Sequence, residues 1–502
     1  MNLPSILKVI AKDLQTQGAR TLLVGGAVRD MIMEREVKDY DIEVYGLNTL
    51  NSLENFLHAY GNVSQVGKCF GVVKLYIDKK EYDFSFPRTE RKIGNGHRGF
   101  CVEVDGFLDF STAAKRRDFT MNALGYDILT GKILDPFGGL QDIQHKVLRH
   151  IDDATFMDDP LRVYRAIQFA ARFEFRIAEE TSILCQKMVE NKQLDELPKE
   201  RIYEEWKKLL LKASKPSIGF ELMRIWGITI RYFPELHALI GYPRWYLEKD
   251  RWAHTMISID IMVSILKKQR QKNKKQASNH KFWLKLLFAV LCHDFGKPFI
   301  TINPKYEDIF SGKNIQKHKS ILAAVQTNTL DVSIYTFSYK TIDLEAVRSF
   351  LYRLTNEHTF IESILPLVAY HLKPSEFYIQ NIKAGDICRL ATKVSIEELV
   401  LVATADYLGG EDKKDISTEA QTNQNITHNY PAGNWLLMVA ENLQVKNKPL
   451  KPLLQGRDLI ALGMTPSVRF KEILDTVYIL QMEGELYNKK IALDYAKSLI
   501  QA

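Results

Sequence analysis

The sequence VGGAVRDMIMEREVKDYDIEVYG, residues 24–46, decides the fold of the first part of the chain. The apolar run TLLV, residues 21–24, predicts a short buried strand that enters a glycine turn at Gly25 and Gly26. A helical segment follows the turn, and YDIEVYG, residues 40–46, then has the β-branched and aromatic content of a second strand. The order strand, turn, helix, strand predicts a mixed α/β domain.

Two aspartates, Asp39 and Asp41, stand one residue apart at the start of this second strand. Side chains separated in this way point to the same face of a strand, so we expect the two carboxylates to lie close together. Like charges so close are costly unless cations neutralise them, and carboxylate ligands suit Mg²⁺. The backbone N–H groups of Gly25 and Gly26 can hold phosphate oxygens, and Arg29 can reach the same anion. The pattern predicts a site for Mg²⁺ and a phosphorylated ligand.

The composition is that of an ordinary globular protein. A single hydrophobic core rarely supports 502 residues, so we expect two to four domains. The net charge of +7 is compatible with a polyanionic partner but does not by itself establish one. Five cysteines without a C-x-x-C pair favour a reducing compartment. The charged N-terminal segment and the lack of an apolar run of about 18 residues predict a cytoplasmic protein without a membrane span.

The pattern changes along the chain. The segments GVVKLYI (71–77) and KEYDFSFP (80–87) predict further strands, whereas helical periodicity dominates from Asp158 onward. Two polar stretches interrupt the helical part. The basic run 267–281 is either a solvated loop or a contact to RNA phosphates, and residues 409–429 predict a linker before a last helical unit.

Three further motifs extend the opening pattern. They are KRRDFTMNALGYD (115–127), DPFGGLQDI (135–143) and MDDPLRVYRAIQFAARFEF (157–175). Together with G-G-x-V-R-D and D-x-D, they resemble the motifs of the class II nucleotidyltransferases, the family of bacterial CCA-adding tRNA nucleotidyltransferases and poly(A) polymerases. The similarity runs from about residue 20 to residue 212. It implies attack of an RNA 3′-hydroxyl on the α-phosphate of CTP or ATP, with pyrophosphate as the leaving group.

The resemblance assigns roles to the residues around the glycine turn. It implies that Asp39 and Asp41 are the catalytic residues and hold Mg²⁺. It also implies that five residues bind the triphosphate and the rest of the nucleotide: Gly25, Gly26, Arg29, Arg116 and Arg117. Asp83, in the predicted strand 80–87, is a candidate supporting acid. The segment 88–100 resembles a loop that moves when specificity changes from C to A.

The resemblance also assigns the recognition of the incoming base. Asp159 and Arg162 would bind its Watson–Crick edge, and residues three apart on one helix share a face. Arg165 would extend that face toward phosphate or base. The sequence departs from the family pattern at Asp158, where Glu is usual, and at Gln168, where arginine is frequent. The second departure removes the basis for a phosphate contact at that position.

A second set of motifs lies in the helical part. The segments RWAHTM, LCHDFGKP and VATADYLGG resemble the metal-binding pattern of the HD phosphohydrolases, with His254, His293, Asp294 and Asp406 as the metal ligands. His318 and His371 fall where members with two metals have additional histidines. Imidazole and carboxylate ligands suit a divalent transition metal (Mn²⁺, Ni²⁺, Co²⁺ or Fe) better than Mg²⁺. A metal-activated water could then cleave phosphoesters.

The resemblance implies an α/β (α+β) nucleotidyltransferase head followed by mostly α-helical neck, HD and tail domains. The boundaries that we predict are 1–145 for the head, 146–230 for the neck with the base-reading residues, 231–410 for the HD domain, and 411–502 for a linker and a C-terminal helical segment. The implied function is addition of CCA to tRNA 3′ ends from CTP and ATP. The alternatives are a poly(A) polymerase, an enzyme that adds only A or only CC, and an HD phosphohydrolase with a non-catalytic nucleotide-binding head.

Overall fold

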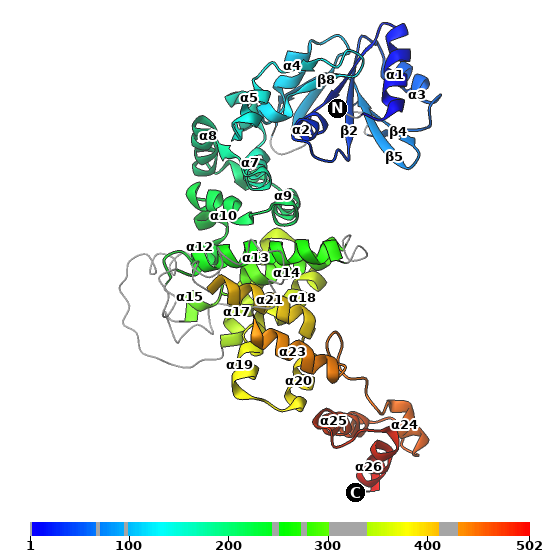
Figure 1. Cartoon of the computed structure of the whole chain (residues 1–502), viewed down its shortest axis with the longest axis vertical. Helices are drawn as coiled ribbons and strands as arrows, with labels where there is room; N and C mark the ends of the chain where they lie inside the picture. The colour runs from blue at the N-terminus through cyan, green and yellow to red at the C-terminus, as the bar shows by residue number, and fades with distance from the viewer. Residues whose placement is uncertain are drawn as a thin grey trace. The chain divides into compact units, whose positions relative to one another are not determined.

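A computed structural model describes residues 3–66, 71–94, 99–242, 250–272, 279–300, 339–410 and 430–501. The chain divides into two compact units, Met1–Ile228 and Thr229–Ala502 (Figure 1). His318 and most of the segment 409–429 lie outside the described residues. The four-part division into head, neck, HD domain and tail stays a prediction.

A seven-stranded sheet forms the centre of the first unit, with the strand order β3-β4-β5-β2-β1-β8-β9. Its strands are β1 (Arg20–Val24), β2 (Tyr40–Tyr45), β3 (Asn62–Val66), β4 (Val72–Ile77), β5 (Lys80–Ser85), β8 (Gly125–Asp127) and β9 (Ile133–Leu134). The helices α1 (Ser5–Thr16), α2 (Gly26–Ile32) and α3 (Leu50–Leu57) accompany it. The mixed α/β head that the sequence predicts is confirmed.

The two central strands position the predicted acidic residues. Strand β2 runs parallel to β5, and Asp41 lies opposite Asp83 in this register. One hydrophobic core buries apolar side chains of both strands, Ile42 and Val44 of β2 and Phe84 of β5. The same core includes Leu7, Ile10 and Leu14 of α1. The alternation of a strand therefore directs apolar side chains to one side and the acids to the other.

Helices make up most of the remainder of the first unit. They are α4 (Phe110–Lys115), α5 (Gly139–Gln144), α6 (Asp153–Asp158), α7 (Leu161–Phe173), α8 (Glu179–Glu190), α9 (Lys199–Lys212) and α10 (Pro216–Ile225), with the 3₁₀ turns η1 (Thr120–Asn122) and η2 (Gln193–Glu196). Helix α7 packs against both α9 and α10. Ten of its residues are buried, so this amphipathic helix forms the core of the helical part.

Two small sheets complete the first unit. Strand β6 (Arg88–Lys92) pairs with β7 (Phe100–Val104) in an antiparallel hairpin, and β10 (Val147–Leu148) pairs with β11 (Arg176–Ile177). The sequence predicts a loop without a clear period over 88–100, and the structure corrects this. The side chains of this segment are largely polar, so a solvent-exposed hairpin leaves no apolar alternation to detect.

The second unit is helical over its described ranges. It contains α11 (Ile228–Tyr232), α12 (Pro234–His237), α13 (Arg251–Lys272), α14 (His280–Cys292), α15 (Lys297–Ile300), α17 (Tyr339–Leu354), α18 (His358–Tyr370), α19 (Lys373–Gln380), α20 (Ala384–Ala391), α21 (Ile396–Gly410), α23 (Pro431–Asn442), α24 (Gly456–Ala461), α25 (Val468–Glu483) and α26 (Lys489–Gln501). Helix α14 is buried on all sides from Leu286 to Cys292. It packs against α13, α18 and α21, and this central position brings its C-terminal end into the interior.

The basic run 267–281 is partly helical, because α13 continues to Lys272 and α14 begins at His280. The prediction of a loop is therefore wrong for both ends of the run, and residues 273–278 lie outside the described ranges. None of the helices in the described ranges combines the length and hydrophobicity that a bilayer crossing requires.

Candidate functional site

Three carboxylates lie on or next to two neighbouring strands in the first unit. Asp39 directly precedes β2, Asp41 is its second residue, and Asp83 lies beside Asp41 on β5. Loss of surrounding water raises the pKa of Asp41, and Arg117 only partly opposes this shift. The negative charges of Asp83 and Asp39 raise this pKa further. The site therefore has an excess of negative charge that a divalent cation would neutralise.

The glycine turn lies directly beside these acids. A Cβ atom on Gly25 would lie 2.6 Å from a terminal nitrogen of Arg117 and 3.9 Å from Oδ2 of Asp41. Gly25 also has a φ of 70°, in the region that favours glycine. Its own N–H donates to the carbonyl oxygen of Leu124 at 3.2 Å. The predicted proximity of the turn and Asp41 is confirmed, whereas the phosphate contact of this N–H stays a prediction.

Two arginines from the motif KRRDFTMNALGYD (115–127) contact the strand that carries Asp41, β2. Arg116 and Arg117 both pair with the buried Glu43, at 3.1 and 2.9 Å. Burial alone would raise the pKa of Glu43, but Arg117 and Arg116 lower it, so this carboxylate stays ionised. Sequence analysis missed Glu43. It continues the alternation of Asp39 and Asp41 by one more step along β2, and this spacing was the signal that could have found it.

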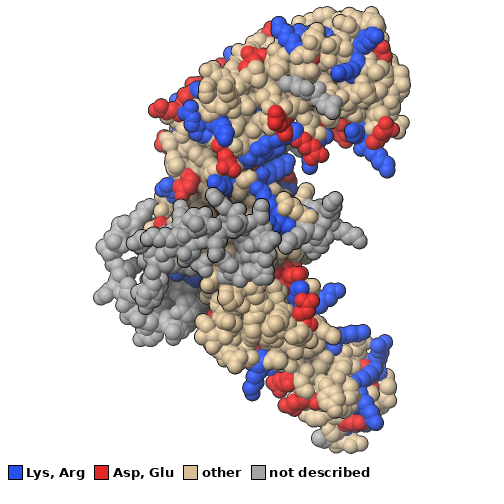
Figure 2. Space-filling view, viewed as in Figure 1, with Lys and Arg blue, Asp and Glu red and all other residues tan. Residues whose placement is uncertain are grey.

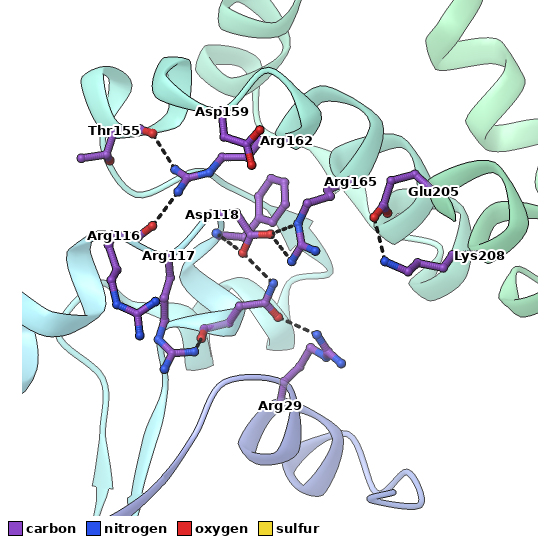
Figure 3. A network of polar contacts seen from close by, with 12 residues as sticks. Arg29, Arg116, Arg117, Asp118, Thr155, Asp159, Arg162, Arg165, Glu205 and Lys208 are labelled. Carbon is purple, nitrogen blue, oxygen red and sulfur yellow. Dashed lines mark hydrogen bonds and ion pairs between the residues drawn. The ribbon is translucent and has the colours of Figure 1, made fainter. Parts of the chain in front are cut away.

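Arg29 points into a buried polar network (Figure 3). It donates to Oδ1 of Asn122 at 2.5 Å and pairs with Asp30 at 2.7 Å. Asn122 in turn donates to Asp118 at 2.9 Å, and Asp118 pairs with Arg165 at 2.6 Å. The network links α2, η1 and α7. This placement favours a positioning role for Arg29 and Arg165 over the direct ligand contacts that the sequence predicts.

The two residues predicted to recognise the base are placed differently from expectation. Asp159 directly follows α6 and does not belong to the helix of Arg162, so the predicted shared helix face is wrong. Arg162 donates to the carbonyl oxygens of Thr155 and Arg116, at 2.7 and 2.6 Å. The carboxylate of Asp159 accepts hydrogen bonds from both terminal nitrogens of Arg201, at 3.3 and 3.1 Å. Pro160 disfavours helical geometry at the preceding residue, which explains the break.

A second site lies in the helical unit. His254 of α13, His293 at the end of α14 and Asp406 of α21 bring their ligand atoms within 4.8 Å of one another. Nε2 of His254 lies 3.2 Å from Nε2 of His293 and 2.8 Å from Oδ1 of Asp406. Nε2 of His293 lies 3.3 Å from the same oxygen. Atoms that bind one metal ion at roughly 2.0–2.2 Å are about 3 Å apart, so the donor set fits a metal.

Two histidines of the second unit share one anchoring arrangement. His293 and His371 each follow the last residue of a helix, α14 and α18 respectively. Each places Nδ1 2.6 Å from a carbonyl oxygen three residues earlier, Val290 and Val368. Because Nδ1 must donate to these carbonyls, Nε2 carries the lone pair and faces inward. This is the tautomer that a metal ligand requires.

Asp294 and His371 complete the surroundings of this cluster. Asp294 is buried and pairs with Arg251 at 2.6 Å and with Lys297. Its carboxylate also lies 3.6 Å from Nε2 of His293. The ring of His371 is 5.3 Å from that of His293, and burial lowers its pKa to about 4. His371 is therefore neutral at physiological pH. The assignment of Asp294 and His371 as ligands stays a prediction.

The multifunctional CCA protein of Mannheimia succiniciproducens is 34% identical to this chain over 397 residues, which are 78% of this chain and 84% of that protein. This chain belongs to the multifunctional CCA protein family. The family members of Haemophilus ducreyi and Pseudoalteromonas atlantica are 39% and 38% identical over 56% and 55% of this chain. The chain spans 64% and 63% of the length of these two relatives, which is less than two thirds.

Domain and structure comparisons agree with this membership of the multifunctional CCA protein family. Residues 21–149 match the poly(A) polymerase head domain, and residues 174–240 match the probable RNA and SrmB-binding site of polymerase A. A CCA-adding enzyme in an apo form has a TM-score of 0.62 at 19% identity, with 99% of this chain and 96% of that chain covered. The Thermotoga maritima CCA-adding enzyme complexed with tRNA has a TM-score of 0.57 at 19% identity and the same coverage.

These likenesses establish the fold of this family member and not the HD resemblance. Both matched segments, residues 21–149 and 174–240, end before the cluster of His254, His293 and Asp406. An HD phosphohydrolase domain therefore stays a prediction that depends on the geometry of that cluster.

Proposed function

We propose that this chain adds C, C and A to the 3′ end of tRNA from CTP and ATP, without a nucleic-acid template. The observation that carries the proposal is the meeting of Gly25, Arg117 and Asp41 within a few ångströms. A bound nucleoside triphosphate needs a close backbone approach, a cation for its phosphates and carboxylates for its metal. Relatives that are named multifunctional CCA proteins, and structures of CCA-adding enzymes with CTP, with ATP and with tRNA, support this proposal.

Asp39 and Asp41 are the proposed ligands of a divalent metal, which CCA-adding enzymes use in the active site. We assign Mg²⁺, because the donor set here is oxygen only. A bound metal of this kind would lower the pKa of the RNA 3′-hydroxyl and neutralise charge on the leaving pyrophosphate. Asp83 supports the pair from β5, where Lys74 lies 3.3 Å from its carboxylate and balances part of its charge.

The cationic side chains orient the nucleotide. Glu43 pairs with the guanidinium groups of both Arg116 and Arg117, and Arg117 lies beside the glycine turn. Since these arginines are held before the nucleotide arrives, little reorganisation accompanies phosphoryl transfer. Arg162 is bonded to the backbone carbonyl of Arg116. The base-reading residue is thereby connected to the residues proposed to hold the phosphates.

The first unit carries as many Asp and Glu as Lys and Arg residues, and Figure 2 shows both kinds on the face of this unit that is in view. The proposed contact to RNA therefore depends on a local group of cations. Loss of surrounding water lowers the pKa of Lys212, and Arg172 and Lys208 lower this pKa further. A polyanion would relieve this repulsion, as RNA phosphates do. Because tRNA is the proposed substrate, the proposal includes a cytoplasmic location for the protein.

The test is a substrate panel. Purified protein is incubated with tRNA that lacks its three terminal nucleotides and with CTP, ATP, or both. We expect two C residues with CTP alone and a single further A when ATP is added. Long A tails on unrelated RNA would identify a poly(A) polymerase, and addition that stops after C or requires a preformed CC end would identify a CC-only or A-only enzyme.

A second activity is proposed for the helical unit, phosphoester hydrolysis at a divalent transition metal held by His254, His293 and Asp406. The convergence of their ligand atoms at 2.8–3.3 Å favours it, because atoms that bind one metal ion lie about 3 Å apart. Metal analysis of the purified protein and hydrolysis of phosphorylated RNA 3′ ends test it. If His293→Ala retained both the metal and the hydrolysis, this assignment would be wrong.

A further inference from the structure

The positive charge of the chain is concentrated at one place in the second unit. Because the first unit carries as many acidic as basic residues, the net charge of +7 arises in the second unit. Between Asp260 and Asp294 the sequence contains eight Lys and Arg residues and no Asp or Glu. This stretch includes the C-terminal part of α13 and the whole of α14, which pack against each other (Figure 1). Such a density of like charge points to a polyanionic partner.

Contacts within the protein account for a minor part of this charge. Two lysines of α14 are paired with acids of other segments: Lys281 with Glu357 at 2.7 Å, and Lys285 with Glu398 at 2.6 Å. The C-terminal end of a helix carries about half a negative charge, so the end of α13 also attracts cations. Half a charge is small against the six Lys and Arg residues of the segment 267–275. The fold alone therefore does not explain this segment.

Three cations of α13 form a surface that the structure describes. From Arg251 to Leu266 the helix has no exposed residue, and Lys267 and Lys268 are the first exposed ones. Arg270 is three positions after Lys267, so these two side chains lie on the same side of the helix. Lys267, Lys268 and Arg270 are named here the basic end of α13. Because they belong to a regular helix and not to a loop, their spacing is fixed.

Arg270 is oriented by an aromatic ring. Its guanidinium carbon lies 5.0 Å from the centroid of the buried Trp283 ring of α14. Nε of Arg270 is buried and has no hydrogen-bond partner among the described residues. Burial lowers the pKa of Arg270, but arginine keeps its charge at physiological pH. The ring thus holds a charged guanidinium with an unused donor, and a planar guanidinium of this kind suits phosphate oxygens.

The lack of apolar surface around the basic end of α13 indicates which polyanion fits. Within the described residues, neither α13 nor α14 exposes a large hydrophobic side chain. A helix that lies on a membrane needs an exposed apolar face, and the centre of a protein interface is rich in aromatic side chains. Nucleic-acid phosphates need neither, because Lys and Arg supply most of the sequence-independent affinity. The surface therefore favours a nucleic-acid backbone over a membrane or an acidic protein.

We propose that the basic end of α13 binds backbone phosphates of the tRNA, away from the 3′ end that reacts in the head. Phosphate contacts fix the position of a nucleic acid and carry no sequence information, so this contact would serve different tRNAs alike. Lys267 lies about 20 Å along α13 from His254 at 1.5 Å per residue, so the contact is separate from the metal cluster. The inference rests on the proposed tRNA substrate and adds a second place at which the chain holds it.

The test measures the affinity of the full chain for labelled tRNA at several salt concentrations by fluorescence anisotropy. Lys267→Gln combined with Lys268→Gln removes two exposed charges and keeps residues that favour a helix. We expect the slope of log affinity against log salt to become shallower by about 2, and affinity at about 0.1 M salt to fall about 10-fold. In nucleotide addition, KM for tRNA should rise by a similar factor, while kcat changes less than about 2-fold.

The matched control is Lys383→Gln combined with Lys393→Gln, which removes the same charge from exposed positions on either side of α20. An equal loss of affinity in the control would assign the effect to net charge and overturn the proposal. An unchanged salt slope in the α13 variant would overturn it as well. Binding to vesicles of phosphatidylglycerol and phosphatidylcholine that the α13 variant loses, with its tRNA affinity intact, would identify a membrane surface instead.

Two outcomes separate this inference from the proposed addition of CCA. If tRNA affinity depends on Lys267 and Lys268 but no nucleotide is added, the addition is refuted and the RNA contact stands. If the α13 variant adds nucleotides with an unaltered KM for tRNA, the contact alone is refuted.

Discussion

The two candidate centres of this chain differ in how complete they are. In the helical unit, three ligand atoms of His254, His293 and Asp406 already lie within 4.8 Å of one another. In the head, Asp39, Asp41 and Asp83 form no such group within the described ranges, although Asp41 and Asp83 are partners on adjacent strands and Asp39 directly precedes one of them. The first centre is preformed, whereas the second leaves room for ligands that arrive with the substrate.

This difference follows from the chemistry proposed for each centre. A transition metal bound by imidazoles is a resident ion, and His293 is oriented for it by the carbonyl oxygen of Val290. Mg²⁺ keeps waters and takes substrate phosphates as ligands. A loose set of carboxylates, with Arg117 held nearby by Glu43, is what such an ion needs. The comparison teaches that the wider spacing of the acids in the head fits the Mg²⁺ site proposed there.

The largest expected effect separates the two centres by mutation. We expect Asp41→Ala to lower nucleotide addition about 1000-fold, roughly 4 kcal/mol in the barrier, because a proposed metal ligand is lost. Hydrolysis of phosphorylated RNA ends should change less than about 2-fold. His293→Ala should show the reverse pattern. Both activities are measured on the same preparations, with Asp39→Ala as a second head variant. Loss of both activities in either variant would show that the two centres do not act independently.

The next effect concerns the stability of the head alone. Asp118 is buried and joins Arg165 to Asn122. Asp118→Asn leaves the charge of Arg165 without its partner, which costs about 3 kcal/mol for a buried pair. We expect calorimetry to show a lower unfolding temperature for the first unit, with metal content in the second unit unchanged. The control Glu190→Gln, on the exposed face of α8, should stay within about 0.5 kcal/mol of the parent.

A smaller effect tests base recognition. Arg201 orients Asp159 through two contacts. Arg201→Ala should lower kcat/KM for CTP and ATP about 10-fold and reduce discrimination between them, because the carboxylate loses its fixed direction. Single-nucleotide incorporation rates measure this. Lys207→Ala on the same helix, which removes a pair with Glu204, is the control. Unchanged discrimination in Arg201→Ala would show that Asp159 is positioned by other means.

Sequence patterns predicted the local parts of these centres. The strand–turn–helix–strand order predicted the place of Asp41 beside the glycine turn, and β1, β2, β4 and β5 lie where the apolar patterns predict strands. Each of these features depends on residues close in sequence, and such periodicities are direct consequences of backbone geometry.

The missed features are long-range pairings. Glu43 lies more than 70 positions before Arg116 and Arg117, and Arg201 is 42 positions after Asp159. No local pattern specifies which distant charge a buried arginine meets. The direction of Arg29 was wrong for a similar reason, since its partner Asn122 is 93 positions away. Tertiary packing decides these contacts, and the sequence of one element does not contain it.

The smallest effect is a test of the charge imbalance in the head. The folded-state pKa of Asp41 is raised, first by loss of water and then by Asp83 and Asp39. Its ionised form therefore costs folding free energy once the pH exceeds the folded pKa, and this cost disappears as the pH falls below the unfolded pKa. Asp41→Asn should stabilise the first unit at pH 7 by about 0.5 kcal/mol, although addition is abolished.

The advantage of Asp41→Asn should shrink as the pH is lowered, because the parent carboxylate becomes protonated and neutral like the amide. Unfolding temperatures between pH 7 and pH 4 measure it, with Asp39→Asn as the comparison, since Asp39 lies outside the strand register that joins Asp41 to Asp83. A stabilisation that persists unchanged at low pH would mean that packing, and not the charge of Asp41, causes the difference in stability between the parent and Asp41→Asn. The head would then lack the uncompensated negative charge that distinguishes it from the preformed centre of the helical unit.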